Sequence, residues 1–118
     1  MKQSPLAEKS LLFATKIVIL YEEQIKTRKD MTILKQLLRS GTSVGANINE
    51  AIFGNSKADF ISKLHISLKE ANESLYWLRL LSNAKLIEDM PASELIGLIE
   101  EIKAMLIASL NTAKTNRD

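Results

Sequence analysis

A segment rich in small residues near the middle of the chain reads Ser40-Gly41-Thr42-Ser43-Val44-Gly45-Ala46-Asn47-Ile48-Asn49-Glu50-Ala51. The sequence around it has helical periodicity, yet the segment itself is full of residues that are indifferent or poor helix formers. A glycine inside a helix costs about 1 kcal/mol relative to alanine, so Gly41 and Gly45 require a compensating interaction. Close approach of another helix is the usual reason for such glycines. We therefore expect tight helix packing along residues 40–51.

On both sides of this segment, apolar residues recur every three or four positions, which predicts α-helices. Ser4 followed by Pro5 is typical of a helix start, and Ser56 with Asp59 is close to a capping box. No part of the sequence alternates with period two, so strands are not expected. Long helices with short connections predict an all-α fold, an antiparallel up-down-up-down four-helix bundle. We expect one domain over residues 1–118, with helices at about 5–27, 30–54, 56–84 and 91–114.

The third helix has the clearest heptad seam, which consists of Ile61, Leu64, Leu68, Ala71, Leu75 and Leu78. The corresponding face of the second helix carries Leu34, Leu37, Gly41, Val44, Ile48 and Ile52. The first and fourth helices have more apolar residues than one buried face needs, namely Leu11, Leu12, Val18, Ile19, Ile96, Ile107 and Leu110. Apolar patches of this size on a small bundle suggest burial by a partner, by default another copy of the chain. We therefore expect a homo-oligomer.

The inventory of reactive residues argues against an enzyme. The chain of 118 residues has no cysteine, and its single histidine, His65, lies beside the seam of the third helix, where packing is a commoner role than catalysis. Position 62 is Ser, so the Glu-x-x-His pair of di-metal bundles is missing, and no phosphate-binding glycine loop is found. We expect no catalytic residues, no cofactor and no metal.

The sequence also indicates the cellular compartment in which the protein functions. Glu8, Lys9 and Lys16 interrupt the apolar residues near the N-terminus, which argues against a signal peptide. No stretch approaches the ~20 apolar residues of a membrane span. With no cysteines, the composition fits a reducing compartment. We expect a cytoplasmic protein with no membrane contact.

Basic residues concentrate around the first predicted connection, although the net charge is only +2: Lys26, Arg28, Lys29, Lys35 and Arg39. In the predicted bundle, Lys85 of the third connection falls at the same end. A ring of identical chains would repeat this patch, so that weak attraction to phosphate groups is multiplied. The alternative is an ordinary helix-end arrangement, because cations suit a helix C-terminus.

A second candidate site lies within the small-residue segment and comprises Ser43, Gly45, Ala46, Asn47 and Glu50. One interpretation is a polar binding face, since Asn47 and Glu50 stand one turn apart. The other is a packing or subunit-interface cluster, whose hydrogen bonds fix how helices or subunits pair. We favour the second, because Gly45 and Ala46 permit close contact between helices.

The residues Ser43-Val44-Gly45-Ala46-Asn47-Ile48-Asn49-Glu50-Ala51 resemble a family signature, Ser-(Ile/Val)-x-Ala-Asn-Ile-x-Glu-(Gly/Ala). The family is that of the four-helix-bundle proteins first noticed in intervening sequences of bacterial 23S ribosomal RNA genes. Ser56-Lys57-Ala58-Asp59-Phe60, Leu68-Lys69-Glu70-Ala71-Asn72-Glu73 and Tyr76-Trp77-Leu78 are similar to the family as well. The resemblance is distributed over about residues 6–112, nearly the whole chain.

This resemblance implies a ring-like homopentamer of up-down four-helix bundles. The family includes the basic accessory protein of diversity-generating retroelements, which binds nucleic acid and a reverse transcriptase. Many members follow the signature with Gly and two arginines, where this chain has Ala51, Gly54 and Asn55. RNA or DNA is the leading expected ligand of a non-enzymatic oligomer. The alternative is a scaffold or accessory subunit that binds a partner protein and makes no contact with nucleic acid.

Overall fold

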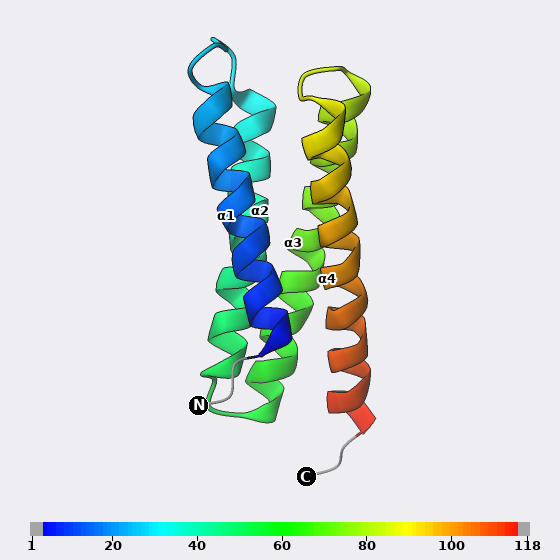
Figure 1. The fold of residues 1–118 in the computed structure, drawn as a ribbon. Helices are drawn as coiled ribbons and strands as arrows, with labels where there is room; N and C mark the ends of the chain where they lie inside the picture. Colours follow the sequence, from blue (N-terminus) through cyan, green and yellow to red (C-terminus); the bar gives the residue numbers. More distant parts are fainter. Residues whose placement is uncertain (1–3, 116–118) are drawn as a thin grey trace.

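Four antiparallel helices form the protein, as described for residues 4–115 in a computed structural model (Figure 1). They are α1 (Pro5–Gln24), α2 (Thr32–Ile52), α3 (Lys57–Asn83) and α4 (Asp89–Thr115). Each helix packs against the next along the chain, and α1 also packs against α4. The predicted all-α up-down-up-down bundle is confirmed. Within residues 4–115, no helix is apolar over a stretch long enough to cross a membrane.

Side chains at the helix starts satisfy the first free backbone N–H groups. The hydroxyl of Ser4 accepts a hydrogen bond of 3.2 Å from the Ala7 amide, and Pro5 occupies the first turn of α1. The hydroxyl of Ser56 accepts one of 3.0 Å from the Asp59 amide at the start of α3. Such caps typically contribute about 1 kcal/mol each, because those amides have no partner within the helix.

Two helix starts differ from the sequence-based boundaries by two residues, for local reasons. α2 begins at Thr32 because the carboxylate of Asp30 accepts bonds from the Thr32 amide (2.9 Å) and hydroxyl (2.6 Å), which leaves Asp30 outside the helix. These bonds hold the pKa of Asp30 below its usual range. α4 begins at Asp89 and includes Pro91 in its first turn, where a missing N–H costs no hydrogen bond. α1 ends at Gln24, three residues before the predicted boundary.

The end of α3 is defined by a left-handed residue, Lys85, with φ of 60°. The Leu86 amide donates to the Leu81 carbonyl (2.9 Å) and the Lys85 amide donates to the Ser82 carbonyl (3.1 Å). This is the Schellman pattern, with lysine where glycine is usual. The Arg28 guanidinium donates to the Leu86 carbonyl and so joins the first and third connections, which lie at the same end of the bundle (Figure 1).

Small residues allow α2 to approach both α1 and α3 closely. A Cβ added at Gly41 would lie 3.2 Å from Ile17 and 3.4 Å from Phe13 of α1. On the other side of α2, the Ser67 hydroxyl of α3 donates to the Val44 carbonyl at 2.8 Å, and the hydroxyls of Ser74 and Ser40 lie 2.9 Å apart. The tight packing expected along residues 40–51 is therefore present on both sides of the helix.

The core follows the apolar periodicity with some exceptions. Its largest fully buried side chains are Phe13, Ile17, Leu37, Ile48, Leu64, Leu78, Leu81, Leu95, Ile99, Ile102, Leu106 and Val44. Ile52, which we placed on the inner face of α2, is 39% exposed, and Ala51 is buried instead. Ile61 and Leu68 are only half-buried, because the buried Ser67 and Ser74 occupy the face of α3 nearest α2.

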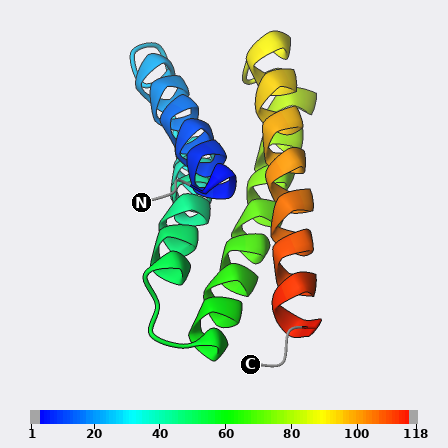
Figure 2. The same ribbon diagram turned by 60° about the horizontal axis from the view of Figure 1, so that its bottom comes forward.

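Two ion pairs join α1 and α4, between Lys9 and Glu101 (3.1 Å) and between Lys16 and Glu94 (3.1 Å). α1 leans across α2, as Figure 2 shows, and its contact with α4 is the least extensive of the four helix–helix contacts. The ion pairs also set the relative heights of the two helices along the bundle. Residue 97 of α4 lies at the level of α1 residues between 9 and 16.

Leu78 lies in the last two turns of α3 with 0% of its surface exposed. Leu78→Ala should lower the free energy of unfolding by about 2–5 kcal/mol, because the methyl groups removed leave a cavity in a packed core. Urea denaturation followed by circular dichroism measures this loss. Met90→Ala is the control at an exposed side chain and should change stability by less than about 0.5 kcal/mol. Equal losses in both variants would contradict the placement of Leu78.

Candidate functional site

The side of α1 that faces away from the core is apolar, although it is exposed to solvent. Four large apolar side chains are exposed there, and Leu11 is the most exposed of them at 68%. We define the outer face of α1 as Ala7, Leu11, Leu12, Ala14, Val18 and Ile19. A contiguous exposed apolar patch on a small protein marks an interaction surface.

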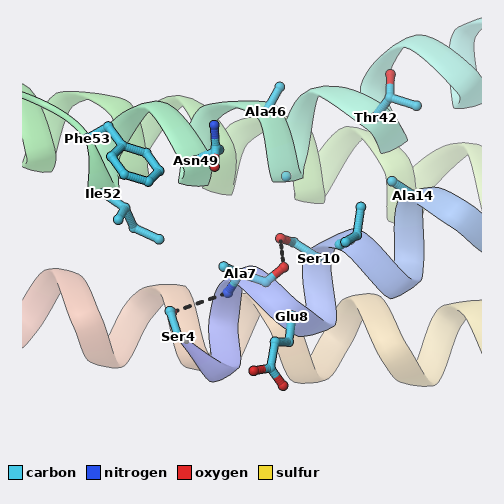
Figure 3. Close-up of a pocket in the computed structure, with 12 residues that line it drawn as sticks. Ser4, Ala7, Glu8, Ser10, Ala14, Thr42, Ala46, Asn49, Ile52 and Phe53 are labelled. Carbon is cyan, nitrogen blue, oxygen red and sulfur yellow. Dashed lines mark hydrogen bonds between the residues drawn. The ribbon is translucent and has the colours of Figure 1, made fainter. Parts of the chain in front are cut away.

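This face continues into a groove of about 540 Å³ between α1 and the C-terminal half of α2. The groove shares Ala7, Leu11 and Ala14 with the outer face of α1. In Figure 3, Ile52 at the end of α2 and the following residue, Phe53, project into the space between the two helices. Phe53 is 62% exposed, so this end of the groove presents a large apolar side chain to solvent.

Apolar and uncharged polar side chains form almost the whole lining of the groove. Glu8 is the one charged residue among the lining side chains described, and its carboxylate points away from the space (Figure 3). The hydroxyl of Ser10 donates to the Ala7 carbonyl at 2.9 Å and so is already satisfied within α1. This lining suits an apolar side chain or helix and offers no acid–base pair for catalysis.

The residues of the second candidate site, all on α2, divide between the two sides of the helix. Gly45 faces α1, where an added Cβ would lie 3.3 Å from the Ser10 hydroxyl, and Ala46 lines the groove. Ser43 and Asn47 lie on another side, where the Asn47 side-chain amide donates to the Ser43 carbonyl (2.9 Å) and hydroxyl (3.1 Å). These four residues do not form one cluster.

Glu50, the fifth residue of the second candidate site, forms an ion pair with a lysine of the next helix. Its carboxylate lies 3.0 Å from the Lys63 ammonium of α3, and this contact raises the pKa of Lys63. Glu50 therefore joins α2 to α3 within one chain. The pair is partly exposed, so its contribution to stability is small.

The five basic candidates are divided as well. Lys26, Arg28 and Lys29 lie in the connection between α1 and α2, and Lys35 lies in the first turn of α2. Arg39 lies one turn further along α2, where its guanidinium forms ion pairs with two carboxylates of α3. These are Glu70, at 3.1 Å, and Glu73, which also accepts a hydrogen bond of 3.0 Å from the Trp77 indole. Arg39 therefore joins α2 to α3.

Arg28 also has a structural role, because its guanidinium donates to the Gln24 side chain (2.7 Å) and to the Leu86 carbonyl. Lys26, Lys29 and Lys35 are exposed and form no ion pair with any residue in the range 4–115. Acidic residues are interspersed among them. The stretches 22–35 and 84–90 together hold five Lys or Arg and five Asp or Glu. This end of the molecule is highly charged but carries no excess of basic residues.

The structure reveals contacts that the sequence-based candidates did not include. The groove that Phe53 lines is formed by the packing of α1 over α2. The ion-pair partners of Arg39 and Glu50 lie on α3. One signal was available in the sequence, since positions 7, 11, 14, 18, 21 and 25 form a second heptad series on α1. His65 is exposed, and residues 4–115 contain no group of three or more His, Asp or Glu suited to a metal ion.

Comparisons with known proteins identify one family. The family model described as 23S rRNA-intervening sequence protein matches residues 2–108. The chain is also similar to a crystal structure, solved at 1.70 Å, of a protein of unknown function of the S23 ribosomal protein family from Bacteroides thetaiotaomicron VPI-5482. The two chains are 46% identical with a TM-score of 0.85, and the match covers 89% of this chain and 97% of the other. Comparison with curated proteins gave no match.

Gly45→Leu should lower the free energy of unfolding by about 1–3 kcal/mol, because the new side chain would overpack the contact between α1 and α2. An added Cβ would already lie 3.4 Å from the Ser10 backbone carbonyl oxygen. Chemical denaturation measures the loss. The control is Ala46→Leu at the adjacent exposed residue, which should stay within about 0.5 kcal/mol of the wild type. An unchanged Gly45→Leu variant would mean that α1 does not pack closely there.

Proposed function

The chain belongs to the family of 23S rRNA-intervening sequence proteins, and from this premise we propose that it is a non-enzymatic homo-oligomer that binds a macromolecule, with RNA or DNA as the ligand. The observation that carries the proposal is the outer face of α1, whose large apolar side chains remain exposed in the single chain. Burying one such leucine contributes about 1.5–3 kcal/mol, so covering several of them supports stable association. A ring of five copies is the stoichiometry implied by the family resemblance.

The proposed ligand contacts are Lys26, Lys29 and Lys35. Their ammonium groups are exposed, and no carboxylate of the described residues pairs with them. One chain offers only these few charges, beside acids of the same end, so its attraction to a phosphate backbone is weak. A ring would repeat the three lysines around its axis and raise the affinity through multivalency. We expect little sequence preference, because lysines that contact phosphate groups do not read base edges.

A specific observation favours the alternative, a scaffold that binds a partner protein. Acids equal the basic residues at the end that carries these lysines, which reduces attraction to nucleic acid. The groove between α1 and α2 is apolar and of a size that accepts side chains of another protein. Measurement of nucleic-acid binding distinguishes the proposed function from this alternative.

The first expected outcome concerns assembly. Sedimentation velocity at micromolar concentration should show one species well above the 13.2 kDa of a single chain, because association buries the outer face of α1. Salt should change this result little, since burial of apolar surface is not screened by ions. A monodisperse monomer would overturn the proposed homo-oligomer.

The second expected outcome concerns the ligand. Fluorescence anisotropy with labelled single- and double-stranded RNA and DNA should show binding at low salt that weakens steeply as salt increases. The double variant Lys26→Glu, Lys29→Glu should bind at least about tenfold more weakly, because it removes phosphate contacts in every copy of the chain. Its sedimentation should match that of the wild type.

The double variant Lys69→Glu, Lys114→Glu is the matched control, because it changes the net charge equally at exposed lysines elsewhere. It should retain most of the affinity. Equal losses in the two variants would mean that only net charge matters. No binding to any of the four nucleic acids at low salt would decide for the protein-binding scaffold.

A further inference from the structure

Tyr76 of α3 is a large aromatic side chain that does not contribute to the core. It is 61% exposed, whereas the other tyrosine, Tyr21, is half-buried and packs against the core. Single exposed apolar side chains are common, so exposure alone assigns no role to Tyr76. Its contacts and its position beside one of the exposed lysines distinguish it from the other exposed apolar residues.

The ring of Tyr76 is held in a defined orientation. It packs edge-to-face with Trp77, with the ring centroids 5.3 Å apart and the planes at 70°. The Trp77 indole donates a hydrogen bond of 3.0 Å to the Glu73 carboxylate, and Arg39 of α2 forms an ion pair with the same carboxylate. A chain of contacts that begins on α2 therefore orients an exposed ring. Such a ring loses little further freedom when a ligand packs on it.

No unpaired acid lies within one turn of Tyr76 on α3. The residues three or four positions away are Asn72, Glu73, Arg79 and Leu80. The carboxylate of Glu73 is already bound by Arg39 and Trp77, and the guanidinium of Arg79 lies 3.5 Å from the Glu100 carboxylate of α4. A ligand with negative charge can therefore reach the ring without meeting an uncompensated carboxylate on this helix.

Tyr76 also lies beside Lys35, one of the three proposed phosphate contacts. The hydroxyls of Ser40 and Ser74, 2.9 Å apart, fix the register of α2 against the antiparallel α3. Five residues back along α2 correspond to five residues forward along α3, so Lys35 lies within one helical turn of the level of Tyr76. Lys35 precedes Arg39 by four residues and so shares the face of α2 from which Arg39 reaches α3.

We propose that Tyr76 is a stacking platform for an unpaired base, so that the nucleic acid bound by this protein is single-stranded. This inference rests on the proposed binding of RNA or DNA and specifies the class of ligand. A strand with a phosphate group on Lys35 can place a neighbouring base on the ring of Tyr76. Within a duplex the faces of the bases are covered by the adjacent base pairs, so only unpaired bases can stack on a side chain.

Stacking on Tyr76 agrees with the small sequence preference expected of the lysine contacts. Every base has an aromatic face, so an exposed tyrosine accepts any of them. The base and the phosphate would make different contributions to affinity, since salt weakens the attraction to Lys35 and has little effect on stacking. A strand bound by both should therefore retain more affinity at high salt than a duplex bound by the lysines alone.

A series of substitutions at position 76 tests the stacking. Tyr76→Leu keeps an apolar side chain and removes the ring, and leucine is a good helix former, so the circular dichroism should match that of the wild type. In fluorescence anisotropy this variant should bind single-stranded RNA and DNA at least about fivefold more weakly than the wild type does, because one base–aromatic stack is lost. Its affinity for duplexes of the same length should be unchanged.

Tyr76→Phe and Tyr76→Trp are the matched controls, because both retain an aromatic ring at the same position. Each should bind single strands within about twofold of the wild type, since any aromatic face can stack with a base. The wild type itself should bind single strands more tightly than duplexes at physiological salt.

Trp77 provides a second measurement, because it is the single tryptophan of the chain and its ring contacts Tyr76. A base stacked on Tyr76 lies near the indole, so a saturating single strand should change the Trp77 emission and a saturating duplex should not. The change should be lost in Tyr76→Leu at concentrations where anisotropy shows that the strand is bound. A purely structural role of Tyr76 would not produce this difference.

The outcomes separate this inference from the proposed function. A wild type that binds none of the four nucleic acids would overturn nucleic-acid binding itself. A Tyr76→Leu variant with wild-type affinity for single strands, or a wild type that binds duplexes as tightly as single strands, would overturn only the stacking on Tyr76. A loss in Tyr76→Phe as large as that in Tyr76→Leu would also contradict it, because the ring would then not be the group that binds.

Discussion

The close approach of α2 to α1 on one side and to α3 on the other is the constraint on which the bundle depends. Gly41 lets α2 pack directly on Ile17, and Ser67 reaches the Val44 carbonyl across the contact with α3. A larger residue at either place would separate the helices, and a polar one without a partner would leave a buried group unsatisfied. The hydroxyl of serine is small enough to fit and finds an acceptor in a backbone carbonyl.

Gly41 and Ser67 are used for packing inside one chain. The surfaces available to partners therefore lie elsewhere on the molecule. The large side chains of α1 and the groove beside Phe53 lie outside the core and are not explained by the stability of the monomer. Lys26, Lys29 and Lys35 lie near one end, away from the groove. The assembly and the ligand binding that we propose therefore involve different parts of the molecule, and mutations should change them separately.

Helical periodicity was enough to predict the bundle, because a repeat of three and four residues determines which face of a helix is buried. It was less reliable where residue size matters more than hydrophobicity. Ser67 and Ser74 are buried in the core, where periodicity alone predicts larger apolar residues, whereas Ile52 is partly exposed. The candidate site was harder to predict. Arg39 looked like part of a basic patch, but its partners Glu70 and Glu73 lie more than thirty positions away and become neighbours only after folding.

The link between Arg28 and the Leu86 carbonyl has a consequence for motion. It connects the two helical hairpins at one end, whereas α1 at the other end is held to α4 through the exposed pair Lys9–Glu101. Local opening therefore costs least at the N-terminal turns of α1, and amide hydrogens there should exchange with solvent before those near the C-terminal end of the helix. The N-terminal turns of α1 would separate from the bundle first, while α2 and α3 remain packed together.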